Sequence, residues 1–175
     1  MSSTPVHESR HTTDSLQIVP FESALREHFY RLNAQWLEQL FRIEDIDRQV
    51  LREPETQVLQ SGGAIFFARL GENIIGTCAL RQESPGVYEL TKMAVDECFR
   101  GYGAGRRLLD AAIAEFHRRA GVRLFLESSS RLTTALRMYE KAGFVMQPTT
   151  RADSHYRRAD VYMIYSPPGP RVAGG

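Results

Sequence analysis

Three closely spaced glycines lie where an apolar strand pattern passes into an amphipathic helix pattern, and they constrain this chain more than any other feature. Gly101, Gly103 and Gly105 allow the backbone to adopt positive φ values and to approach a ligand closely. The first turn of the following helix has N–H groups without partners in the helix, and such groups bind anions. Arginines stand on both sides of the turn, at Arg100, Arg106 and Arg107. The sequence therefore predicts an anion-binding turn suited to a pyrophosphate.

The spacing of these glycines excludes two common phosphate-binding loops. A dinucleotide-binding turn has the pattern G-x-G-x-x-G, whereas the third glycine here comes one residue early. A loop of the G-x-x-x-x-G-K-[ST] type needs a Gly-Lys pair, which the sequence lacks. The stretch from Arg100 to Gly105 instead fits R-x-x-G-x-G. It resembles the acetyl-CoA pyrophosphate motif of the GNAT acetyltransferase superfamily.

Two neighbouring segments strengthen this resemblance. Residues 88–95 are similar to the strand that precedes the motif in that family, and residues 136–144 fit its pattern L-x-x-Y-x-x-x-G-F. The resemblance covers about residues 88–144. It implies an α+β (mixed α/β) fold with a mostly antiparallel sheet flanked by helices, and acetyl-CoA held as co-substrate where two parallel strands splay apart.

The resemblance also implies which residues bind the co-substrate. The strand before the turn would hold the pantetheine arm through its backbone, and a main-chain N–H there would stabilise the oxyanion. Many members place an asparagine where this chain has Leu132, so a serine among residues 128–130 would replace that contact. The predicted cofactor-binding residues are Met93, Ala94, Val95, Arg100, Gly101, Tyr102, Gly103, Ala104, Gly105, Arg106, Arg107 and Ser130.

Hydrophobic periodicity divides the chain into one folded unit, residues 16–165, between segments 1–15 and 166–175 that we expect to be disordered. The expected helices are one of about five turns beginning after Pro20, one from the glycine turn to Gly121, and one at 133–142. The expected strands are 64–69, 74–81, 87–95, 122–127, 144–146 and 161–165. The strand at 122–127 follows a helical crossover and should lie parallel to 87–95.

Acyl transfer from a thioester to an amine requires a group that protonates the departing thiolate. Tyr139 is the candidate acid, since a phenol with a pKa of about 10 keeps its proton at neutral pH. Helical spacing alone would favour a packing role for Tyr139. The resemblance favours catalysis, because the family places its acid at this tyrosine.

The amine must also be deprotonated, and Glu89 is the candidate base, acting through a water molecule. Its carboxyl group would need a pKa raised by burial, which its apolar neighbours in the strand make plausible. The alternative is a solvated residue that shares the polar face of the strand with Thr91. The family resemblance favours the base, since many members carry an acidic residue on this strand.

The sequence constrains the identity of the acceptor molecule less than any other part of the predicted reaction. Segments 44–47 and 154–160 mix acids with arginines, a combination that suits a small amino-acid-like molecule and equally a solvated surface. Glu44, Tyr156 and Arg158 are the predicted substrate-binding residues. Peptide N-termini and polyamines stay open as acceptors.

Composition and charge limit the classes of molecule that this chain is expected to bind. The chain has 22 Lys+Arg and 21 Asp+Glu among 175 residues, a formal charge of +1 that argues against nucleic acid. No apolar run has the roughly 20 residues of a membrane helix, and the polar start of the chain does not resemble a signal peptide, so we expect a cytoplasmic enzyme. Cys78 and Cys98 fit free thiols. The His7–His11 stretch matches H-E-x-x-H without helical periodicity, so we expect no metal.

Two other functions stay open. The same fold could bind acyl-CoA as a sensor or provide an interaction surface, including one for a homodimer, without turnover. Alternatively, a pocket near Cys78, Leu80 and Met93 could accept a longer acyl chain. The presence of both Tyr139 and Glu89 beside the glycine turn favours the enzyme.

Overall fold

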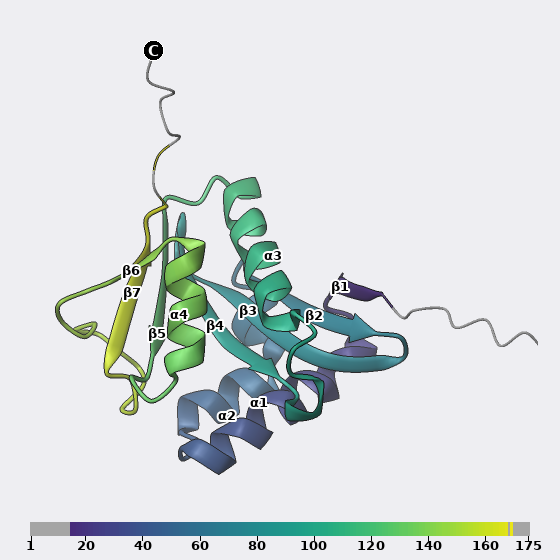
Figure 1. Ribbon diagram of the computed structural model, residues 1–175. Helices are drawn as coiled ribbons and strands as arrows, with labels where there is room; N and C mark the ends of the chain where they lie inside the picture. Colours follow the sequence, from purple (N-terminus) through teal and green to yellow (C-terminus); the bar gives the residue numbers. More distant parts are fainter. Residues whose placement is uncertain (1–14, 168, 170–175) are drawn as a thin grey trace, which may run out of the picture.

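A seven-stranded sheet forms the centre of the computed structural model, which describes residues 15–167 and 169 (Figure 1). The strands are β1 (Leu16–Pro20), β2 (Ala64–Leu70), β3 (Asn73–Ser84), β4 (Val87–Val95), β5 (Arg123–Ser128), β6 (Phe144–Met146) and β7 (Val161–Tyr165). They follow the order β1-β2-β3-β4-β5-β7-β6. Within the described ranges, β4 and β5 are parallel and the other neighbouring pairs are antiparallel. The predicted mixed, mostly antiparallel sheet is confirmed.

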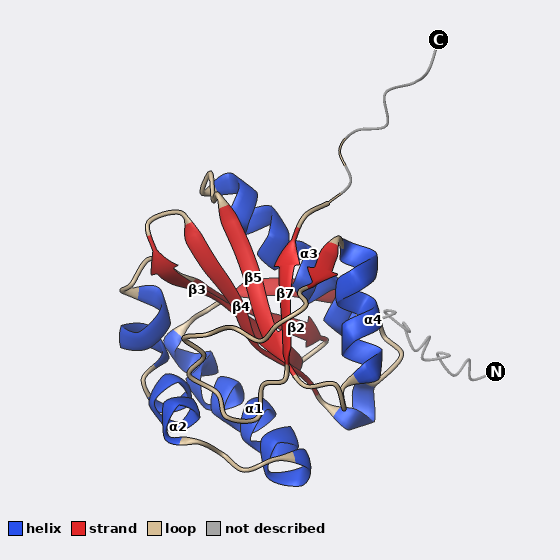
Figure 2. Ribbon diagram, turned by 90° about the vertical axis from the view of Figure 1, so that its left-hand side faces the viewer, coloured by secondary structure: helices blue, strands red, loops and turns tan. Residues whose placement is uncertain are grey.

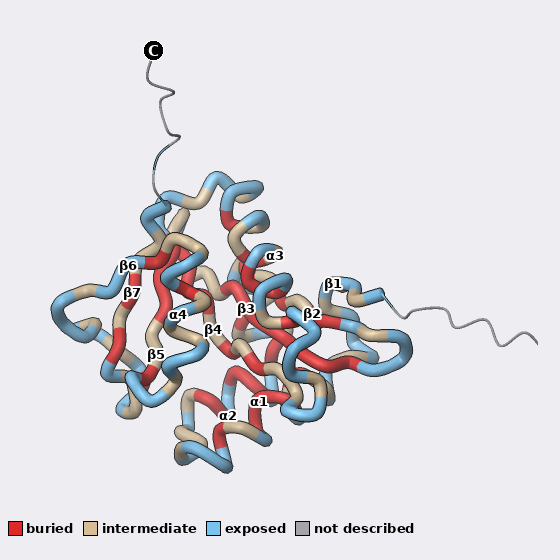
Figure 3. The backbone as a smooth tube through the Cα atoms, in the orientation of Figure 1, coloured by how far each residue is buried: buried red, intermediate tan, exposed pale blue. Residues whose placement is uncertain are grey.

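Helices cover both faces of the sheet (Figure 2). The helices are α1 (Arg26–Leu40), α2 (Asp45–Arg52), α3 (Ala104–Arg118) and α4 (Thr133–Ala142). An apolar core between the sheet and α3 and α4 includes Leu108 and Leu109, and a second core beneath α1 and α2 includes Phe29 and Phe67. Buried stretches follow the central strands and the sides of the helices that face them (Figure 3). In the described part of the chain, no helix has the length and apolarity needed to cross a bilayer.

The parallel pair of strands creates the opening in which the site lies. Pairing between β4 and β5 runs from Val87 opposite Arg123 to Glu89 opposite Phe125. Beyond this point β4 continues beside β3 and β5 continues beside β7. The sheet is therefore split between the second half of β4 and the end of β5.

An irregularity in β4 lies beside this split. Thr77 of β3 pairs with Ala94 and Ala79 pairs with Thr91, so two β4 residues oppose one β3 residue. Lys92, one of these two residues, has a φ of 53°, in the left-handed region. This is a β-bulge, a feature that leaves a residue out of the ladder and redirects its neighbours.

The N-terminal part of the fold differs from the prediction. Residues 16–20 form an edge strand on β2, whereas we expected only helix from Pro20 onward. Helix α1 starts at Arg26 after a 3-10 turn at Ser23–Leu25, so it is shorter than predicted. The edge strand was missed because five residues with one clear alternation carry little pattern, and pairing with β2 stabilises them.

Helix α2 was also not predicted. The Glu44 side chain accepts the backbone N–H of Asp47, and the Asp47 side chain accepts the backbone N–H of Glu44. This capping box starts a helix that buries Val50 and Leu51. The acids at 44–47 thus initiate a helix.

The later elements agree closely with the sequence. Helix α4 spans the predicted residues and ends at Gly143, whose φ of 107° only glycine adopts readily. The two last strands also have the predicted bounds. The termini expected to be disordered, 1–15 and 166–175, and the His7–His11 stretch lie almost wholly outside the described residues.

Candidate active site

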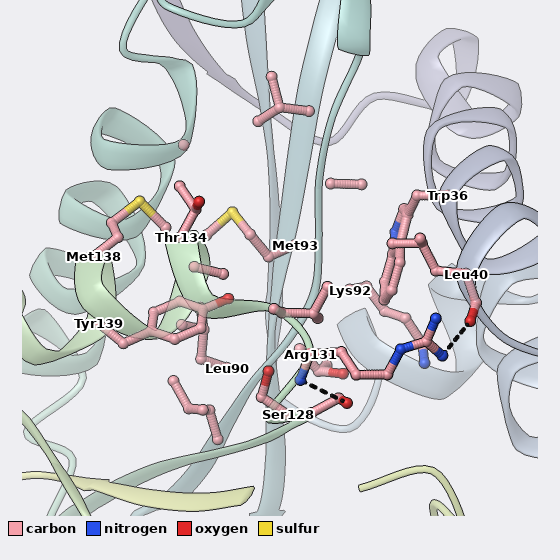
Figure 4. Close-up of a pocket in the computed structure, with 18 of the residues that line it drawn as sticks. Trp36, Leu40, Leu90, Lys92, Met93, Ser128, Arg131, Thr134, Met138 and Tyr139 are labelled. Atoms are coloured by element: carbon pink, nitrogen blue, oxygen red, sulfur yellow. Dashed lines mark hydrogen bonds between the residues drawn. The ribbon is translucent and has the colours of Figure 1, made fainter.

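A cavity of about 810 Å³ lies where β4 and β5 separate (Figure 4). Its walls come from the C-terminal end of α1, the second half of β4, the glycine turn, the end of β5, helix α4 and the loop before β7. Elements far apart in the sequence therefore meet around one cavity. The volume falls within the range of small-molecule sites.

The glycine turn forms one end of the cavity. Gly101 and Gly103 have φ values of 89° and 79°, and a Cβ added at either would meet no described atom within 4 Å. Gly103 caps the N-terminus of α3, so the first N–H groups of that helix are not covered by a capping side chain. Six predicted residues of the turn line the cavity: Arg100, Gly101, Gly103, Ala104, Gly105 and Arg106. The turn has the form of an anion-binding helix N-terminus.

Two predicted residues of the turn lie away from this wall. Tyr102 is 57% exposed and packs against Phe99, with ring centroids 6.1 Å apart. Arg107 donates to the carbonyl oxygen of Leu16 and so ties α3 to β1. The structure therefore assigns Arg107 a contact within the fold.

The backbone of β4 forms the floor of the cavity. Met93, Ala94 and Val95 all line it, as predicted. They follow the bulge at Lys92, where the ladder with β3 is interrupted. The β5 ladder ends at Glu89, so the main-chain groups of these residues on the β5 side are available to a ligand.

Tyr139 reaches into the cavity from α4 (Figure 4). It is 7% exposed, and its ring packs edge-on against Phe144 at 6.0 Å. Burial raises the pKa of its hydroxyl above the ordinary value. Tyr139 is therefore a protonated phenol at the cavity wall at neutral pH.

Glu89, the predicted base, is not among the residues that line the cavity. It is 1% exposed, and its Oε2 lies 3.0 Å from Arg81 Nη2. Burial raises its pKa to about 7 despite the opposing charge of Arg81. The predicted effect of burial on the pKa of this carboxyl group is present.

The carboxylate that lines the cavity is Glu127, at the end of β5. Its side chain is 2% exposed, and its Oε2 has no hydrogen-bond partner among the described residues. The nearest cation is Arg151, with Nη1 3.7 Å from this oxygen. Glu89 Oε2 is likewise buried without a hydrogen-bond partner among the described residues, so what distinguishes Glu127 is its place in the cavity wall.

A buried ionic cluster closes the cavity near α2. Asp47 accepts from Lys92 Nζ at 2.7 Å and from Arg158 Nη1 and Nη2 at 2.6 and 2.9 Å. Burial alone would raise the pKa of Asp47, but hydrogen bonds from Arg158 and the charge of Lys92 outweigh it and lower the pKa to about 2. Tyr156 packs beside both cations, with Lys92 Nζ 4.8 Å and Arg158 Cζ 4.9 Å from its ring centroid.

Of the predicted acceptor residues, Tyr156 and Arg158 line the cavity and Glu44 does not. The Glu44 carboxylate accepts the backbone N–H groups of Arg157 and Arg158 at 3.1 and 3.2 Å. Glu44 therefore anchors the loop before β7 to α2. This role keeps it from the cavity.

The chain's family follows from the sequence comparison. The sequence model of the acetyltransferase (GNAT) family matches residues 22–144, well over half of the chain. The chain belongs to the GNAT family of acetyltransferases. No curated protein matches the sequence.

Solved structures share the GNAT fold. A GNAT-family acetyltransferase from Staphylococcus aureus Mu50 is 20% identical and aligns over 86% of this chain and 98% of its own, with a TM-score of 0.77. An acetyltransferase from Streptococcus agalactiae 2603 is 18% identical over 85% of this chain and 96% of its own, with a TM-score of 0.73. A Bacillus subtilis acetyltransferase solved in complex with CoA is 18% identical and aligns over 86% of this chain and 97% of its own, with a TM-score of 0.64.

One departure from the GNAT motif is visible at the start of α4. Leu132, where the resemblance to the family predicts an asparagine, lines the cavity, as do Ser128 and Ser129. Ser130, the predicted replacement, turns away and bonds to Asp160 through its N–H at 2.7 Å and its hydroxyl at 2.6 Å. Ser128 and Ser129 are thus the serines placed to contact a ligand.

Asp47 gives a direct test of the ionic cluster. Asp47→Ala should lower the free energy of unfolding by about 3–5 kcal/mol, because it leaves the buried Lys92 ammonium without its carboxylate. The matched control is Asp45→Ala, whose carboxylate is 94% exposed and pairs with Arg48, and it should cost at most about 1 kcal/mol. Denaturant unfolding measures both. Equal losses would contradict the cluster.

The Asp47 carboxylate also makes the stability of the protein depend on pH in the acid range. Its pKa is lower in the folded than in the unfolded chain, so its contribution is present above about pH 4 and is lost as the pH falls toward 2.

Proposed function

We propose that this GNAT protein transfers an acetyl group from acetyl-CoA to the primary amine of a small amino-acid-like molecule, in one direct step. The observation that carries the proposal is that one cavity joins the glycine turn, the β4 bulge, Tyr139 and Glu127. The CoA complex of the Bacillus subtilis relative supports the choice of donor. A binding module would need the turn but would have no use for an acid and a base beside it.

The turn and β4 would hold the donor. The N–H groups at the start of α3, with Arg100 and Arg106, suit the pyrophosphate, and the open space at Gly101 and Gly103 lets the phosphates approach the backbone. The main chain of Met93 to Val95 suits the pantetheine arm. An N–H beside the bulge would stabilise the oxyanion.

The reaction then needs two proton transfers. The amine nitrogen attacks the thioester carbon, the C–N bond forms and the C–S bond breaks, and the sulfur leaves as thiolate. The Tyr139 hydroxyl gives its proton to the thiolate. The amine proton goes to a carboxylate, and we propose Glu127, because it lines the cavity whereas Glu89 is not among the lining residues. Glu89 acting through a water is the rival base.

Two alternative functions have different expectations. A sensor would bind acetyl-CoA without turnover, so no amine would be acetylated. A longer acyl chain would need space near Cys78 and Leu80, but both are buried at 0% exposure, and Met93 is the one of the three that lines the cavity. This burial supports the choice of acetyl as the transferred group.

Binding of the donor is tested by thermal unfolding. Acetyl-CoA at about 100 times its dissociation constant should add about 2.7 kcal/mol of stability. Gly103→Val should abolish this gain, because a branched side chain would occupy the open space of the turn. Gly71→Val is the matched control, since Gly71 also has a positive φ, 58°, in the β2–β3 turn outside the cavity.

A gain that persists in Gly103→Val would place the donor elsewhere. Turnover is tested with acetyl-CoA and a panel of primary amines by thiol release and product mass. Binding without thiol release for any amine would favour the sensor.

A further inference from the structure

A cluster of two aromatic rings and one guanidinium forms the α1 side of the cavity. Figure 4 shows two of its members, Trp36 and Arg131. Trp36 and Phe41 pack edge to face, with ring centroids 5.8 Å apart. Arg131, from the loop before α4, lies across the cavity with its Cζ 5.0 Å from the Phe41 ring centroid. Its Nη1 donates to the carbonyl oxygen of Leu40 at 2.8 Å. A stacked and anchored guanidinium is pre-organised to bind a planar anion.

In the described part of the chain, both polar side chains of this cluster, Trp36 and Arg131, have N–H donors that no acceptor occupies. Trp36 Nε1 is buried and has no hydrogen-bond acceptor among the described residues. Arg131 forms no ion pair within the described part of the chain, since its one side-chain hydrogen bond goes to a carbonyl. A buried N–H without an acceptor is costly, and structures retain few of them.

The other cations near α2 are already neutralised. Asp47 receives hydrogen bonds from both Lys92 and Arg158, and the Arg158 pairing is bidentate. Arg158, one of the predicted substrate-binding residues, therefore already has a carboxylate partner inside the protein. Arg131 has no such partner among the described residues, although it lines the same cavity.

We propose that Arg131 and Trp36 Nε1 bind the carboxylate of an amino-acid acceptor, with its apolar side chain against the Trp36 and Phe41 rings. The amine of the same molecule then faces Glu127 and Tyr139. This inference rests on the proposed function and adds the groups that distinguish an amino acid from a simple amine. A guanidinium and an indole N–H together match the two oxygens of a carboxylate.

The test compares two reaction products that differ only by the carboxylate. Binding of N-acetyl-L-phenylalanine and of N-acetylphenethylamine to the native protein with saturating CoA is measured by titration calorimetry. The native protein should bind the carboxylate form at least about tenfold more tightly. Arg131→Gln should remove this preference and leave CoA affinity unchanged. The control Arg52→Gln changes an exposed arginine of α2 outside the cavity and should retain the preference.

A second variant separates the indole donor from the ring. Trp36→Phe keeps an aromatic ring and removes the N–H, so it should weaken binding of the carboxylate form several-fold and leave the amine form unchanged. Equal affinity of the two probes for the native protein, failure of both to bind, or a preference that survives in Arg131→Gln would overturn the inference. A loss of CoA affinity in Arg131→Gln with the preference intact would instead assign Arg131 to the donor. The thiol-release assay judges the proposed function separately.

Discussion

Replacing Tyr139 with phenylalanine should lower kcat by roughly 10²–10⁴-fold, the usual range for the loss of a general acid. The hydroxyl is on the cavity wall, and burial raises its pKa, so the phenol still carries its proton when the thiolate forms. The ring remains packed against Phe144 in the variant, and the change removes only the hydroxyl. Steady-state kinetics with acetyl-CoA and an accepted amine measures the effect.

Two controls give this result its meaning. The acetyl-CoA dissociation constant and the melting temperature should change little, because the glycine turn and the packing are untouched. Tyr165→Phe is the matched substitution, since its ring also packs against Phe144, at 5.3 Å, but it lies outside the cavity wall. Equal kcat values for the native protein and Tyr139→Phe would assign Tyr139 to packing alone.

The glycine turn and α4 were predicted well because their chemistry is local. Three glycines between a strand pattern and a helix pattern fix the turn, and Gly143 fixes the end of α4 through its positive φ. Met93 to Val95 follow from their place directly before the turn. Tyr139 then comes to the cavity because α4 packs beside the split in the sheet.

The choice between Glu89 and Glu127 could not be made from the sequence. Both carboxylates lie in apolar strand patterns, and period-two alternation says which residues share a face but not what covers that face. Arg81 of β3 pairs with Glu89, which is not among the residues that line the cavity. Glu127 is at the cavity because β5 separates from β4 two residues before it. Both facts depend on tertiary contacts.

The acceptor side shows the same limit. Asp47 and Arg158 are 111 residues apart, and their bidentate pairing depends on α2 packing beside the loop before β7. Trp36 belongs to a helical stripe that indicates only a buried face, and Arg131 follows three serines in a loop. No local pattern indicates that these two residues share one wall.

Glu127→Gln should lower kcat/KM by roughly 10²–10⁴-fold, while Glu89→Gln should leave it within a few-fold of the native value. The glutamine keeps the size of the side chain in both variants and removes the ability to accept the amine proton. Because Glu127 lines the cavity and Glu89 does not, the two substitutions separate a carboxylate in the cavity wall from an equally buried one outside it. The comparison must use one substrate, since the amine's own ionisation also shapes the pH profile.

The pKa of Glu89 makes the rival outcome recognisable. If Glu89 were the base, kcat/KM would rise through pH 7, and this rise would vanish in Glu89→Gln but persist in Glu127→Gln.

The ionisation of Glu89 can also be followed without turnover, through the stability of the protein. The pKa of Glu89 is higher in the folded than in the unfolded chain. Its contribution to the free energy of unfolding is therefore fully present below about pH 4.5 and is lost as the pH rises through 7. Thermal unfolding from pH 5 to 8 should show this fall in the native protein and in Glu127→Gln, and a smaller one in Glu89→Gln. A pH-rate limb near 7 that only Glu89→Gln removes would make Glu89 the base and leave Glu127 a structural role.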